Sequence, residues 1–182
     1  MLRLFKPSPQ KQAAEALFDT IVAQARRPEL YADFDAPDTL DGRFDVLALH
    51  AYLVIARLKG EAEAEITAQH LFDALFKDMD DNLRELGVGD LTVPKKIKVM
   101  AEAFYGRVAA YDDALKAEGD EALAAALQKN VYANAEGVED AAAAMAAYVR
   151  SQAVFLAAQP TARLLNGVVR FADIRAEKEA AL

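Results

Sequence analysis

Apolar side chains recur every three or four residues along most of this chain, which is the spacing of one face of an α-helix. An early stripe consists of Ala13, Leu17, Ile21 and Ala25, and a later stretch repeats the pattern from residue 71 to residue 86. No segment of useful length alternates apolar and polar residues as a strand does. Only 8 glycines and 6 prolines occur among the 182 residues. The pattern predicts an all-α fold, a single-domain bundle of about six to seven helices over residues 1–182.

Capping and helix-breaking residues predict where the helices begin and end. Ser8 is a candidate N-cap with Pro9 behind it, and Gly87 is a candidate C-terminal cap. Residues 29–38 are expected to be irregular, because Pro28 ends the first helix. The segment 41–60 is apolar on nearly all sides and is expected at the centre of the fold. The expected helices cover residues 8–26, 41–60, 67–87, 92–118, 119–131, 138–158 and 161–175, followed by a charged tail at about 176–182.

The composition excludes several classes of function. The formal net charge of −8 repels phosphate backbones, so nucleic acid is not expected as the main partner. The absence of cysteine removes disulfides, cysteine-ligated zinc and thiol nucleophiles. The most apolar run, from Val46 to Leu58, is too short to span a bilayer, which needs roughly 20 residues. Residues 1–10 contain neither a signal-peptide core nor a transit-peptide pattern, so a cytoplasmic protein is predicted.

Histidines are rare, and their spacing does not match a metal site. Neither His50 nor His70 has a glutamate three residues before it, as carboxylate-bridged di-iron bundles require. His50 lies in the most apolar segment, where a buried and hydrogen-bonded side chain is the favoured interpretation. A haem ligand or a proton relay stays open as the alternative.

An acidic run at residues 78–85 is similar to the magnesium-binding motif of helical prenyl synthases, but it is incomplete. The fifth position counted from Asp80 is Arg84, and two aspartates alone bind magnesium weakly. A solvated face with ion pairs Asp73–Lys77 and Asp80–Arg84 is favoured instead. No phosphate-binding loop and no nucleophile elbow occurs in the sequence. The sequence therefore predicts no enzyme, no metal and no cofactor.

Three lysines, Lys95, Lys96 and Lys98, fall in the first turns of the helix expected from residue 92. The helix dipole disfavours cations there by roughly 0.3–1 kcal/mol each. Acidic side chains of the neighbouring helix expected at residues 67–87 could offset this unfavourable interaction, and this explanation is favoured. Contact with an acidic partner or with anionic lipid is the alternative.

Both ends of the chain carry cations beside apolar residues. Leu2, Leu4 and Phe5 next to Arg3 and Lys6 could touch a membrane surface, although a frayed terminus is favoured. The helix expected at 161–175 is basic and amphipathic, with cations at Arg163, Arg170 and Arg175. Packing of that helix against the core is favoured.

Residues 37–111 contain a specific combination of segments. They are PDTLDGRFDVLALHAYLVIARL (37–58) and QHLFDALFKDMDDNLRELGVGDLTVPKKIKVMAEAFYGR (69–107), followed by Tyr111. On these segments the middle of the chain resembles the ubiquinol–cytochrome c chaperone family. The likeness is weak over residues 1–30 and from about residue 120 onward.

The resemblance implies a non-enzymatic assembly factor of the cytochrome bc1 complex that binds newly made cytochrome b. Mitochondrial members of the family work with a small partner subunit and sit near the ribosomal exit tunnel. The chain looks like a bacterial relative, acting in the cytoplasm or peripherally at the cytoplasmic face of the inner membrane. A small partner subunit is a further candidate contact that the resemblance implies.

A chaperone for apolar helices needs an apolar groove with a charged rim. The family-like positions Phe104, Tyr105 and Arg107 are candidate anchors, together with the three lysines, because aromatic and arginine side chains dominate binding energy. The neighbouring run Asp41, Gly42, Arg43 and Asp45 is expected to form a helix-entry turn with a structural role. The alternative function is a helical binding module for a quinone or a lipid. That function requires a closed pocket of a few hundred Å³, whereas a client site is open.

Overall fold

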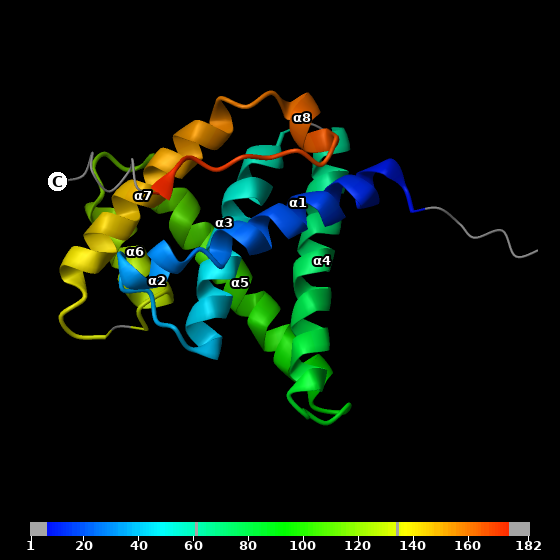
Figure 1. Cartoon of the computed structure of the whole chain (residues 1–182), viewed down its shortest axis with the longest axis horizontal. Coiled ribbons are helices and arrows are strands. Elements are labelled where there is room, and N and C mark those ends of the chain that lie inside the picture. Colours follow the sequence, from blue (N-terminus) through cyan, green and yellow to red (C-terminus); the bar gives the residue numbers. More distant parts are fainter. Residues whose placement is uncertain (1–6, 61, 134, 175–182) are drawn as a thin grey trace, which may run out of the picture.

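The computed structural model describes residues 7–60, 62–133 and 135–174, and all regular secondary structure within these ranges is helical. The predicted all-α fold is thereby confirmed. Figure 1 shows the helices in chain order: α1 (Pro9–Ala25), α2 (Pro28–Ala32), α3 (Leu40–Leu58), α4 (Ala62–Glu85), α5 (Val93–Lys116), α6 (Glu121–Asn130), α7 (Glu139–Ala157) and α8 (Thr161–Leu165).

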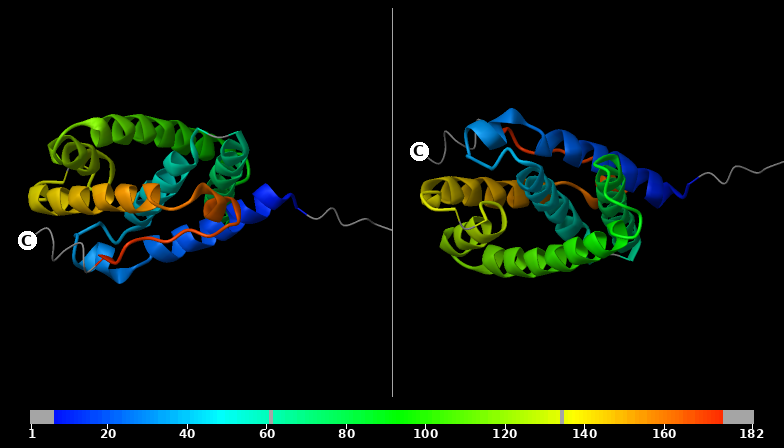
Figure 2. Two further views of the ribbon diagram at one scale, coloured as in Figure 1. Left: turned by 90° about the horizontal axis from the view of Figure 1, so that it is seen from above. Right: turned by 90° about the horizontal axis from the view of Figure 1, so that it is seen from below.

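The helix α3 lies in the middle of the molecule, as its sequence predicts. Seen from above, α5 and α1 form the two outer sides, and α3 and α7 lie between them (Figure 2). Most of α3 is buried, because it contacts α1, α4 and α7. Its N-terminus is capped by Thr39, whose side chain accepts a hydrogen bond from Gly42 N at 3.0 Å.

The beginning of the chain departs from prediction at one point. Ser8 caps α1 as expected, accepting a hydrogen bond from Lys11 N at 3.2 Å. Pro28 does follow the end of α1, but it also begins α2, so the expectation of irregular structure over residues 29–38 is wrong for residues 29–32. Proline is tolerated there because the first-turn N–H has no partner within the helix. Glu29 adds a favourable negative charge at the same end.

The helix α4 begins at Ala62, earlier than the predicted start near Thr67. Its first turn carries Glu63 and Glu65, which the helix dipole favours. Its end is as predicted: Gly87 has a φ of 80°, and Val88 N–H donates to Leu83 O at 3.0 Å. This pattern is a glycine C-cap that satisfies the last carbonyls of the helix.

The helix predicted over residues 161–175 is much shorter than expected. α8 ends at Leu165, because Gly167 adopts a φ of 75° and closes a C-cap through Val168 N–H to Arg163 O. The following segment runs along α7 instead. Its backbone is held by hydrogen bonds with two buried glutamine side chains. Gln152 in α7 bonds the backbone of Ala172, and Gln159 just after α7 bonds the backbone of Arg170.

Packing of this C-terminal part against the core is confirmed. Leu164, Val169 and Ile174 are buried there. Arg175 and the tail at 176–182 lie outside the described residues, as do the residues from Leu2 to Lys6 discussed above.

His50 is a buried structural residue, as favoured from the sequence. Its Nδ1 lies 2.8 Å from Val46 O and its Nε2 lies 2.8 Å from the Tyr148 hydroxyl. Burial lowers the pKa of the imidazole to about 4, so the side chain is neutral near pH 7. Gln24 of α1 donates to the same Tyr148 hydroxyl, which links α1, α3 and α7.

Candidate functional site

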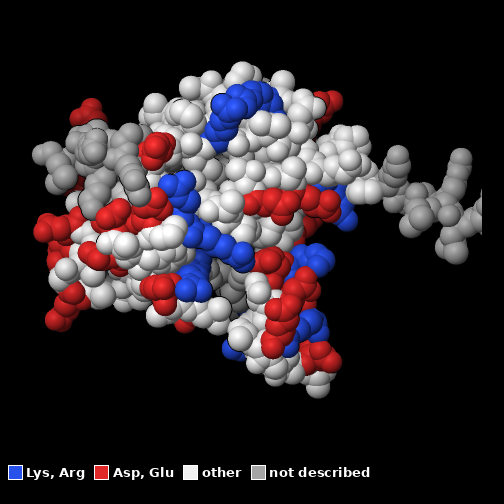
Figure 3. All heavy atoms as spheres, in the orientation of Figure 1, with Lys and Arg blue, Asp and Glu red and all other residues white. Residues whose placement is uncertain are grey.

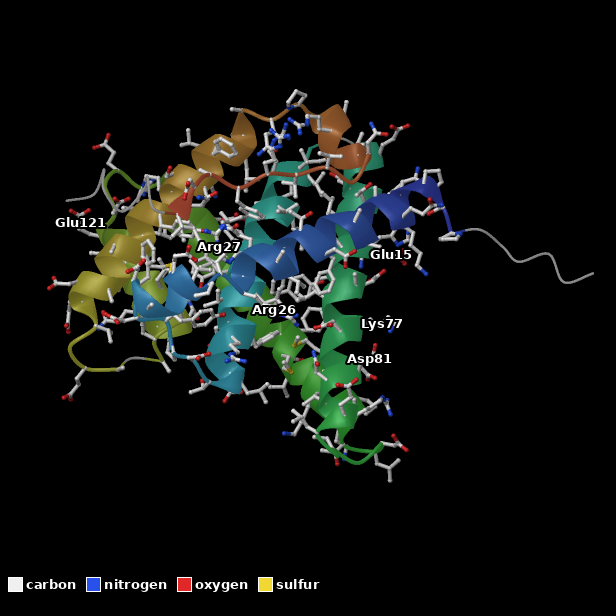
Figure 4. All side chains as sticks on the ribbon, viewed as in Figure 1. Glu15, Arg26, Arg27, Lys77, Asp81 and Glu121 are labelled. Carbon is white, nitrogen blue, oxygen red and sulfur yellow. The ribbon has the colours of Figure 1, made fainter. Side chains whose placement is uncertain are left out.

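An open groove of about 1540 Å³ lies between five helices. It is bounded by the C-terminal end of α1, by α2, by the N-terminal half of α3, by the C-terminal end of α4 and by the N-terminal half of α5. Figure 4 labels Arg26 at the end of α1, beside the space between α3 and α4. In the space-filling view the surface is hollowed next to the projecting end of α4 (Figure 3).

The walls of the groove are largely apolar. Leu47 and Met79 lie at its base and are almost fully buried. Leu40, Leu86 and Val99 stand at its edges with 62 %, 59 % and 63 % of their surface exposed. Large apolar side chains left this exposed around one concavity mark a surface that another molecule covers.

Charged side chains form the rim. Arg43 and Asp38 pair across 2.6 Å at the surface, and the Arg43 guanidinium holds the pKa of Asp38 below its usual value. Three cations of the rim, Arg26, Lys95 and Lys96, form no ion pair with any residue in the described ranges. The rim therefore offers positive charge that the described residues do not neutralise at contact distance.

A half-buried ion pair stands in the groove wall. Arg107 of α5 contacts Asp45 of α3 at 2.6 Å, with 18 % and 14 % of the two side chains exposed. The guanidinium also lies over the Phe44 ring, 5.7 Å from its centroid. Burial raises the pKa of Asp45 to about 6, an effect that Asp41 reinforces and Arg107 opposes.

Two polar atoms on the same helix lack partners behind this pair. Arg107 Nη1 and the Tyr111 hydroxyl are both buried and make no hydrogen bond within the part of the chain that the structure describes. Burial also raises the pKa of Tyr111 above its usual range. The Asp45–Arg107 pair thus joins α3 to α5 next to a polar region of the core that is incompletely satisfied.

The structure separates the residues that the sequence suggested as partner-binding. Lys95, Lys96 and Arg107 line the groove. Lys98 does not line it and lies 3.8 Å from Glu102 of its own helix.

The two aromatic candidates also lie away from the groove lining. Tyr105 is 60 % exposed and stacks on Phe72, with ring centroids 5.4 Å apart. Phe104 is only 2 % exposed and packs against Phe76, so its expected role as a surface anchor is corrected to a core residue.

The acidic helix α4 is the favoured source of negative charge to offset the unfavourable position of the three lysines, but in the described residues it forms no direct ion pair with any of Lys95, Lys96 and Lys98. The acids of α4 pair along their own helix instead, with Lys77 bonded to Asp81 and Arg84 to Asp80. The Asp80–Arg84 pair is as predicted, whereas Lys77 selects Asp81 rather than Asp73.

Residues 41–45 form the start of α3, as expected of a helix entry, and part of this segment also faces the groove. A Cβ on Gly42 would lie 2.1 Å from Pro37 O, so only glycine fits. Asp41, Arg43 and Asp45 line the groove. Sequence reasoning missed Arg26, Leu40, Phe44 and Val99 as groove residues, although Leu40 and Val99 were available as apolar residues outside the predicted stripes.

Fold and groove together describe an all-helical protein with a large concavity that is open rather than enclosed. A sequence model described as Ubiquinol-cytochrome C chaperone matches residues 32–171. The chain belongs to this family.

Relatives of known name and one solved structure agree with this assignment. The ubiquinol-cytochrome-c reductase complex assembly factor 1 of Xenopus laevis is 26 % identical, over 80 % of this chain and 73 % of the frog protein. Its Homo sapiens counterpart is 24 % identical over 67 % of this chain, and the match spans only 41 % of the human protein. The crystal structure of the Cbp3 homolog from Brucella abortus is similar with a TM-score of 0.83 and 39 % identity, covering 92 % of each chain.

Two further properties concern membranes and metals. Among the helices of the described ranges, none has the length and apolar character needed to cross a bilayer. Over the same residues, histidine, aspartate and glutamate side chains form no group of three or more that could hold a metal ion.

Proposed function

We propose that this protein is an assembly factor of the ubiquinol–cytochrome c reductase (bc1) complex and that its client is newly made cytochrome b. The observation that carries the proposal is the open apolar groove with a charged rim, found in a chain of the ubiquinol–cytochrome c chaperone family. The protein acts by binding rather than by catalysis. The names of the relatives indicate which complex is assembled, and the apolar lining of the groove indicates that the client is an apolar polypeptide.

The groove suits an apolar polypeptide segment better than a small molecule. Small-molecule pockets commonly measure about 300–1,000 Å³ and enclose most of their ligand. This concavity has about 1540 Å³, and its edge residues Leu40, Leu86 and Val99 are more than half exposed. An α-helix with its side chains is about 10–12 Å wide, and it can lay one apolar face on such a surface. A quinone or lipid as the ligand is correspondingly disfavoured.

The charged rim would set the orientation of the client. Lys95 and Lys96 project from the start of α5, where the helix dipole adds to their positive charge. Acidic groups flanking an apolar client segment would therefore be attracted to this end of the groove. The role places the protein on the cytoplasmic side of the inner membrane, with a small partner subunit as a further candidate contact.

Crosslinked affinity purification of the tagged chain from cells that are making the bc1 complex tests the proposal. Cytochrome b is expected as the dominant partner by mass spectrometry. The double variant Leu86→Asp and Val99→Asp places charges on the groove edge, and we expect it to recover at least about tenfold less cytochrome b. Both residues are exposed, so the fold should survive.

Ile66→Asp is the matched control, because Ile66 is 50 % exposed on α4 but lies outside the groove lining. Its recovery of cytochrome b should equal that of the unmodified chain. Equal capture by the groove variant would show that the client binds elsewhere. A stoichiometric quinone or lipid without any bc1 subunit would support the small-molecule alternative instead.

A further inference from the structure

One long stretch of this acidic chain contains no acidic residue. Between Asp140 and Asp173 the only charged residues are Arg150, Arg163 and Arg170, although the chain as a whole carries 29 aspartates and glutamates. The stretch covers almost all of α7, the whole of α8 and the segment that follows it. The stretch is therefore positively charged, and the acidic excess of the chain lies entirely outside it.

Part of this stretch forms an exposed apolar surface. Val154 and Phe155 near the end of α7 are 68 % and 40 % exposed, and Val168 after α8 is 44 % exposed. The two segments lie side by side, because the Gln159 amide donates both to Phe155 O and to Arg170 O. In Figure 1 they run along the upper edge of the molecule, away from the groove.

Two cations, Arg163 and Arg170, lie beside these apolar residues. Neither Arg163 nor Arg170 forms an ion pair with any residue of the described ranges. Arg150 differs, because it bonds Asp120 at 2.6 Å on the other side of α7. In the space-filling view the top of the molecule is largely white around one blue strip, with red atoms at its left and right edges and larger red groups lower down (Figure 3).

The backbone of this surface is fixed in place. Arg57 of α3 donates to Leu156 O in the last turn of α7 at 3.1 Å and to Gln159 O just beyond that helix at 2.6 Å, which fixes this end of α7 on α3. The side-chain amides of Gln152 and Gln159 also hold the segment after α8 against α7. Each amide donates to a backbone carbonyl of that segment and accepts from the backbone N–H of the same residue. The exposed side chains are thus presented by a rigid surface.

We propose that Val154, Phe155, Arg163, Val168 and Arg170, the outer α7 face, dock on a bilayer surface that contains anionic phospholipid. Exposed apolar side chains enter the interfacial region of a bilayer while neighbouring arginines contact anionic headgroups. With only two free cations the face is too weakly basic for a nucleic-acid backbone, which rewards many phosphate contacts. Lys95 and Lys96, which also form no ion pair in the described ranges, line a groove that contains Asp38, Asp41 and Asp78, whereas no acidic residue lies within the stretch that forms the outer α7 face, so charge favours this face. The groove then points away from the membrane and stays accessible.

Flotation of the purified full chain with vesicles tests this proposal without any client. Vesicles of phosphatidylethanolamine and phosphatidylglycerol should bind the protein, whereas pure phosphatidylcholine vesicles should bind it at least about tenfold less. Binding should fall as sodium chloride is raised, because salt screens exposed charges. The double variants Arg163→Glu with Arg170→Glu, and Val154→Ser with Phe155→Ser, should each lose most of the bound fraction.

The charge-matched control is Lys95→Glu with Lys96→Glu, which changes the net charge equally but lies in the groove rim. It should keep vesicle binding, and circular dichroism should show that all variants fold. Equal loss in this control would overturn the proposal, because binding would then follow net charge. Absence of binding to every protein-free vesicle would also overturn it and would point to an acidic protein as the occupant. Neither outcome bears on cytochrome b capture, which is measured separately.

Discussion

Arg107 of α5 and Asp45 of α3 are joined by a 2.6 Å ion pair in the wall of the groove. Both helices contribute residues to the groove lining, so the ion pair fixes the distance between α3 and α5 and also sets the local charge of the groove wall. Each member depends on the other, since a half-buried charge without its counter-charge is costly.

Arg107→Ala should lower the free energy of unfolding by roughly 3 kcal/mol near pH 7, because Asp45 then loses the cation that stabilises its carboxylate and is left buried, either charged and unpaired or protonated at a cost. Urea denaturation followed by circular dichroism measures the loss. Arg43→Ala is the control, since Arg43 pairs with Asp38 at the exposed surface. That variant should lose far less stability. Equal losses in both variants would mean that the buried pair has no special role.

Asp45 should make stability depend on pH. Its pKa is about 6 in the folded chain, above the ordinary 3.8, so the folded state binds the proton more readily than the unfolded state. The stabilisation is complete below about pH 4 and is lost as pH rises through 6. The stability of the unmodified chain relative to Asp45→Asn should thus fall by about 1–3 kcal/mol between pH 4 and pH 7. A constant difference over that range would contradict the raised pKa.

His50 should act in the opposite direction. Its pKa of about 4 in the folded chain is below the ordinary 6.5, so the unfolded state binds the proton more readily. The stabilisation is present above 6.5 and is lost as pH falls towards 4. Relative to His50→Gln, the unmodified chain should lose up to about 3 kcal/mol on acidification from pH 7 to pH 4. Denaturant midpoints at several pH values separate this effect from that of Asp45, and parallel curves would refute it.

Gly42→Ala should destabilise the fold by about 1–3 kcal/mol, because the added Cβ meets Pro37 O at 2.1 Å. Gly106→Ala is the matched control within α5, where nothing lies within 4 Å of the added atom. That variant should be more stable by up to about 1 kcal/mol, since alanine is the better helix former. Thermal unfolding compares them, and a neutral Gly42→Ala would show that the turn before α3 can move aside.

Lys96→Glu should reduce capture of cytochrome b about threefold or more, because it reverses a rim charge that no described residue neutralises. Lys98→Glu serves as the comparison, since Lys98 lies outside the groove lining and close to Glu102. Its capture should be unchanged. Pull-down of labelled cytochrome b at two salt concentrations measures both. Equal effects of the two substitutions would place the client on another part of α5.

The sequence predicts most helices well, because caps and apolar stripes are local signals. Ser8, Gly87 and the apolar segment of α3 all act as expected. The errors have local causes too. Pro28 follows the end of one helix and also begins the next. Gly167 ends α8 because it adopts a left-handed backbone conformation, which a glycine in a sequence permits but does not require.

The groove is harder to predict, since five helices converge to form it. Lys95, Lys96 and Arg107 could be selected because they are unusual residues at family-like positions, and they do line it. Phe104 was selected for the same reason, yet it faces the core. Helical spacing shows which residues share a face, but it does not show which helix covers that face. Leu40 and Val99 become recognisable only once the helices are assembled.

The contacts of Gly167 have a consequence for how the chain is made. A Cβ at this residue would lie 2.9 Å from the Ala16 side chain, so the turn that follows α8 is fitted closely against α1. Phe171 likewise contacts His50, with ring centroids 5.5 Å apart. Contacts between such distant parts of a sequence slow folding, because a long loop must close before they form. During translation, α1 can pack on α3 and α4 first, whereas its contact with Gly167 forms only after residues 8–167 have all left the ribosome.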